Sequence, residues 1–242
     1  KREFESVGNI NGFYQEYMNV AQSPESAPFK PDWVQLHHYD FERRNGQSVL
    51  VRKKGDEEEI KPVEVYCGVD PASSLKATAD FFVIASIAVD NDNNKYIIDI
   101  YRKRISPAEQ PRLVLETYKK YKPRRMRIET VAYQEALRAA TRDLMKKEDI
   151  YIPGLEKGVK PRNRKSERLL SLVPMVAKKQ FYFRPEDMTA QQEFLSYPKG
   201  RHDDIMDAIW TALDGHKPCR HKDYVKVDTD RDVEIDIDWL TI

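Results

Sequence analysis

Residues 200–210 read Gly-Arg-His-Asp-Asp-Ile-Met-Asp-Ala-Ile-Trp, and the rest of the chain is best interpreted from them. A glycine precedes the run and apolar residues recur every three or four positions after it. This pattern predicts a helix from about residue 202 to 214 with one buried side. Asp204 and Asp207 are three positions apart, so their carboxylates lie on one face of that helix.

Three aspartates crowd the start of this predicted helix, Asp203, Asp204 and Asp207. Like charges held this close repel one another unless a cation lies in front of them. A divalent metal ion suits the position, because hard cations take oxygen ligands from carboxylates. The alternative is a solvated helix N-terminus, where Asp203 or His202 caps the helix and the macrodipole favours acids. The upstream sequence favours the metal site.

Two further acids stand at the ends of predicted strands. Residues 64–70 show a strand pattern that ends at Asp70, since the proline that follows interrupts a strand ladder. Residues 124–129 show a second, short strand pattern that ends at Glu129. If the two strands are adjacent and parallel, both carboxylates emerge at one sheet edge, where the aspartate helix can complete the site. The alternatives are that Asp70 belongs to a turn or cap, and that Glu129 pairs with Arg127 or caps the next helix.

The remaining pattern predicts a mixed α/β sheet with helices on its faces. Two apolar strands around an Asn/Asp-rich turn form a hairpin, and helical segments alternate with strands after it. The predicted strands are residues 81–89, 95–102, 151–152 and 181–183, and the predicted helices are residues 107–121, 133–147, 166–178 and 188–196.

The chain divides into three predicted regions: a lead-in segment at 1–62, a main domain at 63–216 and an acidic tail at 217–242. Within the lead-in, residues 48–52 are a strand candidate, and the charged run at 53–59 is an exposed turn. The chain begins with a lysine rather than a methionine, so we expect a fragment of a longer polypeptide. It contains no phosphate-binding Gly-x-x-x-x-Gly-Lys-Ser/Thr loop.

Composition excludes several classes of protein. Lys and Arg (41) balance Asp and Glu (40) to a formal charge of +1, so nucleic-acid binding depends on a local patch. The two cysteines cannot form a disulfide scaffold, which favours a reducing compartment. No apolar stretch approaches the length of a membrane span.

A basic loop between two predicted helices supplies the local patch. Glycines and a proline make the segment from residue 154 to 165 a loop that can reach phosphates. The alternative is an ordinary solvated surface. No segment resembles a base-reading helix, so contacts should be mostly to phosphates and weakly sequence-specific. The candidate DNA-binding residues are Lys157, Lys160, Arg162, Arg164, Lys165 and Arg168.

Three motifs together resemble a known family. They are Gly68-Val69-Asp70-Pro71-Ala72, Ile128-Glu129 and His202-Asp203-Asp204-x-x-Asp207-Ala208. They resemble the nuclease domain of tailed-bacteriophage large terminase subunits, in the ribonuclease H-like superfamily. The resemblance covers about residues 63–215 and extends loosely to 13–19, so that residues 1–62 come from a linker after a missing ATPase half. It implies an α/β fold with a mixed sheet of five or more strands flanked by helices.

The resemblance also implies a site and a reaction. Asp70, Glu129 and Asp204 are expected to be catalytic metal ligands, and Asp203 and Asp207 further metal ligands. Two Mg²⁺ or Mn²⁺ ions are expected, because such a pair serves the attacking and leaving oxygens of a phosphodiester. The expected enzyme is an endonuclease that cuts concatemeric double-stranded DNA for a viral packaging motor with little sequence specificity.

The expected partners follow from the same family. They are double-stranded DNA and, through the full-length protein, the portal protein and the small terminase subunit. We expect no membrane partner, a monomeric fragment, and a location in the host cell cytoplasm.

Two other functions stay open. A Holliday-junction resolvase or transposase-like nuclease has the same fold and would require branched or end-specific DNA. A non-catalytic module that docks on a portal would use the acids only structurally, and the acidic tail favours it.

Overall fold

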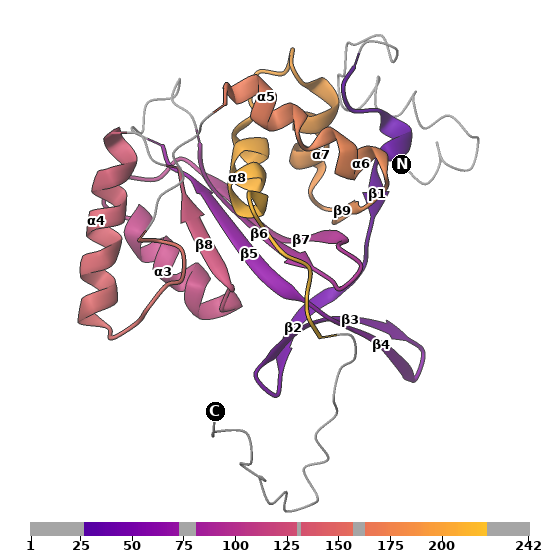
Figure 1. Ribbon diagram of the computed structural model, residues 1–242, viewed down its shortest axis with the longest axis horizontal. Coiled ribbons are helices and arrows are strands. Elements are labelled where there is room, and N and C mark those ends of the chain that lie inside the picture. Colours follow the sequence, from indigo (N-terminus) through magenta and orange to yellow (C-terminus); the bar gives the residue numbers. More distant parts are fainter. Residues whose placement is uncertain (1–26, 73–80, 130–131, 157–162, 222–242) are drawn as a thin grey trace, which may run out of the picture.

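The computed structural model describes residues 27–72, 81–129, 132–156 and 163–221, which form a central sheet between two layers of helices (Figure 1). One face is covered by α3 (Gln110–Tyr121) and α4 (Ala132–Lys147). The other face is covered by α5 (Lys165–Leu170), α6 (Val173–Ala177), α7 (Met188–Ser196) and α8 (Asp204–Leu213). A short 3₁₀ turn, η1 (Pro31–Trp33), precedes the first strand. Across these ranges, no helix is long and apolar enough to cross a membrane.

The central sheet of the described residues has six strands in the order β1-β9-β7-β6-β5-β8. Strand β6 is antiparallel to both of its neighbours and the other five run in one direction, which confirms the predicted mixed sheet. These strands are β1 (Gln35–Leu36), β5 (Glu64–Asp70), β6 (Phe82–Val89), β7 (Lys95–Lys103), β8 (Arg125–Ile128) and β9 (Phe181–Phe183). A separate antiparallel sheet contains β2 (Asp40–Arg44), β3 (Gln47–Lys54) and β4 (Glu57–Pro62).

Strand β6 is buried at every position because helices cover both faces of the sheet. Its sequence is therefore almost continuously apolar, as expected of a central strand. The neighbouring strand β5 alternates between the two cores. Cys67 and Val69 pack in the core beneath α3 and α4, and Tyr66 packs in the core beneath α5–α8. The predicted hairpin of β6 and β7 is confirmed.

The prediction of an exposed turn over residues 53–59 is wrong. The turn is limited to residues 55–56, and the charged residues on either side pair in the hairpin of β3 and β4. Lys54 lies opposite Glu57, and Arg52 lies opposite Glu59. Opposite charges across an antiparallel pair stabilise it, so a run typical of a solvated turn forms a ladder instead.

Two other predicted elements differ from the structure. The predicted helix at 166–178 is two short helices, α5 and α6, because Pro174 has no N–H to continue the helical ladder. Residues 151–152 form no strand. The segment meets the edge strand β8 through a hydrogen bond from the Met126 N–H to the Pro153 carbonyl (2.8 Å), which is less than a ladder requires.

Helix α8 crosses strand β5 at Gly68. A Cβ atom on this glycine would lie 2.0 Å from the carbonyl oxygen of Ala208 and 2.4 Å from the nitrogen of Ala212. A residue without a side chain is therefore required for this approach. The contact sets the first turn of α8 beside the end of β5.

We expect Gly68→Ala to destabilise the domain by at least about 3 kcal/mol, the upper end of the cost of overpacking, because the clash involves backbone atoms. Urea or thermal unfolding measures the loss. The matched control is Gly55→Ala. Gly55 differs from Gly68 in having a positive φ (62°), and an added Cβ there meets no atom within 4 Å. Only strain of about 1 kcal/mol is expected there. Equal losses in the two variants would contradict the close approach.

Candidate active site

The sheet brings the two strand-ending acids to one edge. Strands β5 and β8 are adjacent and parallel, with Val69 paired to Ile128, so the condition stated from the sequence is met. Asp70 is the last residue of β5, and Glu129 directly follows β8. Both acids therefore emerge where the carboxyl ends of these strands meet.

The first turn of α8 adds two more carboxylates. Asp204 and Asp207 are almost completely buried, and Asp203 is the residue that precedes the helix. Burial, followed by the negative charges of Asp207 and Asp204, raises the pKa of Asp70 well above its usual value. Glu129 contributes to the same shift. Burial also raises the pKa of Asp207, to about 6. Four of the predicted acids therefore share one electrostatic environment.

Helix α5 inserts two cations among these acids. Lys165 Nζ lies 2.8 Å from Asp203 Oδ1 and 2.5 Å from Asp207 Oδ2. Arg168 is buried, its Nη1 lies 3.0 Å from Glu129 Oε1, and its guanidinium group stacks over Trp210 at 4.7 Å. These two residues of the predicted DNA-binding set contact the carboxylates directly.

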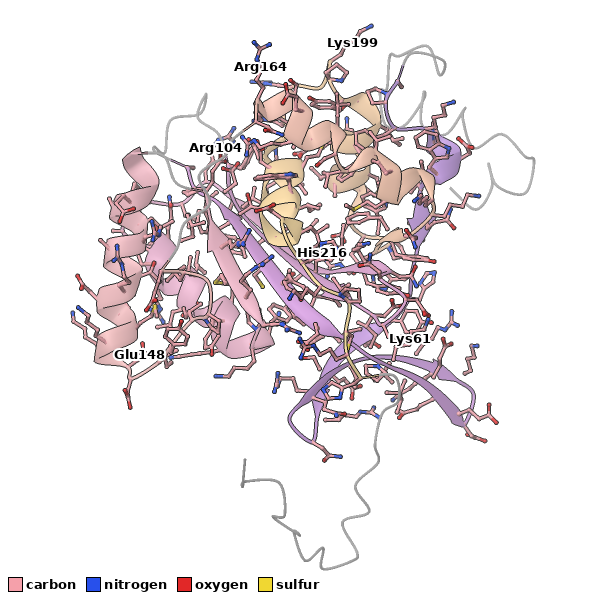
Figure 2. All side chains as sticks on the ribbon, in the orientation of Figure 1. Lys61, Arg104, Glu148, Arg164, Lys199 and His216 are labelled. Atoms are coloured by element: carbon pink, nitrogen blue, oxygen red, sulfur yellow. The ribbon has the colours of Figure 1, made fainter. Side chains whose placement is uncertain are left out.

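The other predicted DNA-binding residues fall into two groups. Lys157, Lys160 and Arg162 lie outside the described residues. Arg164 is exposed at the start of α5. Figure 2 shows Arg164 and Arg104 at the same end of the molecule, and Glu148 and Lys61 near the opposite end. Arg164 therefore has a position from which it can meet DNA near the carboxylates.

Two residues of the site were not anticipated from the sequence, Arg102 and Glu193. Arg102 lies between two acids, with Nη2 3.6 Å from Asp204 Oδ2 and Nε 3.6 Å from Glu193 Oε1. Glu193 is buried, and its Oε2 accepts a hydrogen bond from the Ile205 N–H (2.8 Å), which satisfies a free donor in the first turn of α8. Burial raises the pKa of Glu193 to about 8. The sequence indication for Glu193 is an acid on the buried face of a predicted helix, next to the core residue Phe194.

The donor set fits a hard divalent cation. All four acids offer carboxylate oxygens, and Asp207 Oδ1 is buried without a hydrogen bond from any described residue. Among the described residues, no three Asp, Glu, His or Cys side chains converge tightly enough to hold one ion as they stand. Lys165 and Arg168 lie between them instead. Coordination of one metal ion by several of these carboxylates would therefore require their side chains to turn away from Lys165 and Arg168.

Asp70→Asn is expected to raise the free energy of unfolding at neutral pH when divalent metal is absent. The folded-state pKa of Asp70 lies well above its ordinary value of 3.8, so stability is lost as pH rises between the two values. The loss is about 1.4 kcal/mol for each pKa unit. Thermal unfolding in EDTA across this pH range checks the expectation, because the advantage of the variant should shrink towards pH 3.8.

The control for this measurement is Asp92→Asn, which changes an exposed acid in the turn between β6 and β7. It should change stability little, because the side chain is exposed. An Asp70→Asn variant that is less stable than the wild type at every pH would contradict a destabilising negative charge at Asp70.

Comparison with known proteins identifies the family. The family model of the terminase RNaseH-like domain matches residues 67–214, more than half of the chain. Structures of the large terminase nuclease from thermophilic phage G20c, with bound zinc, magnesium and cobalt, are similar, each with a TM-score of 0.51. Their sequences are 18%, 18% and 17% identical to this chain. The matches cover 77%, 79% and 79% of this chain and 96%, 98% and 98% of those chains.

Identity at this level shows the fold alone, and no curated protein sequence matches the chain. The family assignment rests on the matched domain and agrees with the acids placed at the sheet edge. This chain belongs to the terminase RNaseH-like domain family.

Proposed function

We propose that this chain is a metal-dependent endonuclease that cuts concatemeric double-stranded DNA for a viral packaging motor. The observation that carries the proposal is the set of four acids, with Asp70 and Glu129 at one sheet edge and Asp204 and Asp207 in the first turn of α8 beside it. Membership of the terminase RNaseH-like family supports the same reaction. The proposed enzyme is a phosphodiester hydrolase.

The metal ligands in this proposal are Asp70, Glu129 and Asp204, with Asp203 and Asp207 as further ligands. Two Mg²⁺ or Mn²⁺ ions would supply a water of lowered pKa and neutralise charge on the leaving oxygen. Terminase nuclease structures with bound zinc, magnesium and cobalt support a requirement for divalent metal. The chain's own contribution is to hold carboxylates in a buried position, where their negative charge is most costly unless a cation is present.

Other side chains orient these acids. Arg102 lies on one side of Asp204, and His202 Nδ1 lies 3.5 Å from the same Oδ2 atom. Glu193 fixes the first turn of α8 through its bond to the Ile205 N–H. We propose that Arg102, His202 and Glu193 position Asp204. Contacts that restrict the rotamers of a metal-binding side chain hold its oxygens in a defined orientation.

DNA is proposed to lie across this edge and to contact the protein mainly through phosphates. Arg164 is exposed beside the site and, together with Lys157, Lys160 and Arg162, makes the candidate contact surface. Phosphate contacts carry no sequence information, which supports cutting with little sequence specificity. Lys165 and Arg168 would join them only after release from the carboxylates.

The wider assignment follows from the family. We propose a nuclease domain at 63–216, a lead-in at 1–62 and an acidic tail at 217–242. Phe29, only 1% exposed, packs in the main core and β1 pairs with β9, which supports a lead-in that packs on the domain. The proposed partners in the infected host cell cytoplasm are the portal protein and the small terminase subunit, reached through the full-length protein. The proposed state of this chain is monomeric.

Plasmid cleavage tests the proposed reaction. Wild-type protein should nick and linearise plasmid DNA with Mg²⁺ or Mn²⁺ and not with EDTA. Asp204→Asn should lower the rate by more than about 10²-fold, because even residues that merely support metal ligands cost roughly 10–100-fold. Asp92→Asn, an acid at the opposite sheet edge, should cut at the wild-type rate. Wild-type cleavage by Asp204→Asn would show that the site is wrong.

Metal binding provides a test that does not depend on activity. Mg²⁺ or Mn²⁺ should raise the melting temperature of the wild type, since a ligand that binds the folded state stabilises it. The increase should disappear in Asp70→Asn and remain in Asp92→Asn. Equal increases in all three proteins would indicate metal binding elsewhere, and a folded wild type without any increase would favour the docking module.

A further inference from the structure

A stack of two arginines on one phenylalanine lies at the same sheet edge as the acids. The guanidinium carbons of Arg102 and Arg104, at the end of β7, lie 3.5 and 3.9 Å from the ring centroid of Phe81. Both guanidinium groups therefore pack against the same ring. Such stacking fixes the direction of both cations.

This stack borders a pocket. The pocket has a volume of about 230 Å³ and is lined in part by Arg102, Arg201, His202 and Thr189. Two of these side chains, Arg102 and His202, also contact Asp204, so the pocket is directly beside the proposed catalytic acids. One water molecule takes roughly 30 Å³ in the liquid, so the pocket has room for several waters. A phosphate group, which is a few waters in size, also fits.

The pocket is lined by hydrogen-bond donors, and one of them, Arg201, faces no carboxylate of the described residues. Arg102 Nε is buried and donates no hydrogen bond to any described residue. Arg201 is exposed, and within the described part of the chain it pairs with no carboxylate. Thr189 adds a hydroxyl group. Glu193 also lines the pocket: its Oε2 accepts the hydrogen bond from the Ile205 N–H, and its Oε1 lies 3.6 Å from Arg102 Nε.

The position of the pocket complements that of α5. In the sheet order, β8 lies on one side of β5, and β6 followed by β7 lies on the other. Arg168 contacts Glu129 after β8, whereas Arg102 belongs to β7. The carboxylates thus have cations on both sides. A polyanion that crosses a cluster of acids needs attraction on each side to offset their repulsion.

We propose that the pocket lined by Arg102, Arg201 and His202 binds a phosphate of the DNA backbone that neighbours the phosphodiester to be cut. The inference rests on the proposed function, because it takes DNA as the substrate. Arg201 is the contact at the mouth, and Arg102, held by Phe81, is the contact at the wall next to Asp204. Binding of this phosphate would set the position of the DNA strand relative to the catalytic carboxylates.

The test is the salt dependence of binding to a short duplex, measured by fluorescence anisotropy with EDTA present to prevent cleavage. Arg201→Ala should weaken binding severalfold and reduce the slope of log K against log salt by about 0.9, the value for one phosphate contact. Arg201→Lys should restore the slope, because it restores the charge.

The matched control is Lys199→Ala. Lys199 is exposed two residues from Arg201 and does not line the pocket, and Figure 2 shows its side chain at the outer end of the molecule. This variant should bind DNA as the wild type does. An unchanged slope in Arg201→Ala, or an equal loss in Lys199→Ala, would overturn the proposed phosphate contact.

These outcomes are separable from those of the cleavage assay. Metal-dependent cleavage by the wild type, with an unchanged slope in Arg201→Ala, would keep the nuclease and remove the pocket. If Arg201→Ala loses one phosphate contact but the wild type does not cut DNA with any metal, the phosphate-binding pocket stands and the proposed nuclease activity is wrong.

Discussion

The close approach of two backbones at Gly68 is the constraint on which the rest of the site depends. It allows α8 to lie on β5, and Asp204 and Asp207 then reach the sheet edge where Asp70 and Glu129 emerge. A larger residue at position 68 would lift the helix and separate the acids. The geometry of one glycine thus fixes the density of negative charge at the edge of the sheet.

That density of charge has an energetic cost, and the surrounding cations offset it. Lys165, Arg168 and Arg102 approach the acids from different elements. A buried carboxylate without a positive neighbour is expensive, and these ion pairs allow the fold to tolerate several. In the proposed function, a metal ion bound to these carboxylates would have to displace the same pairs. Side-chain cations and metal would then compete for the same oxygens.

The sequence was sufficient to predict those parts of the site that depend on local pattern. Asp70 at a strand end and the pair Asp204 and Asp207 on a helix follow from short-range periodicity. Arg102 and Glu193 could not be predicted, because each acts through a partner that is distant in sequence. Tertiary contact also decides the charged run at 53–59, where each residue has a partner across a strand pair. Helix α5 likewise ends before the predicted residue 178, because Pro174 interrupts the helical hydrogen bonds. Hydrophobic periodicity alone does not indicate this break.

The order of the elements along the chain also governs when the site can form. Asp70 and Glu129 are made early, but among the described residues α8 comes after every other helix and strand. Contacts between segments this far apart close large loops and form slowly. During synthesis, a growing chain would therefore hold two of its acids without the rest. The full set of acids is therefore assembled only after α8 has been synthesised.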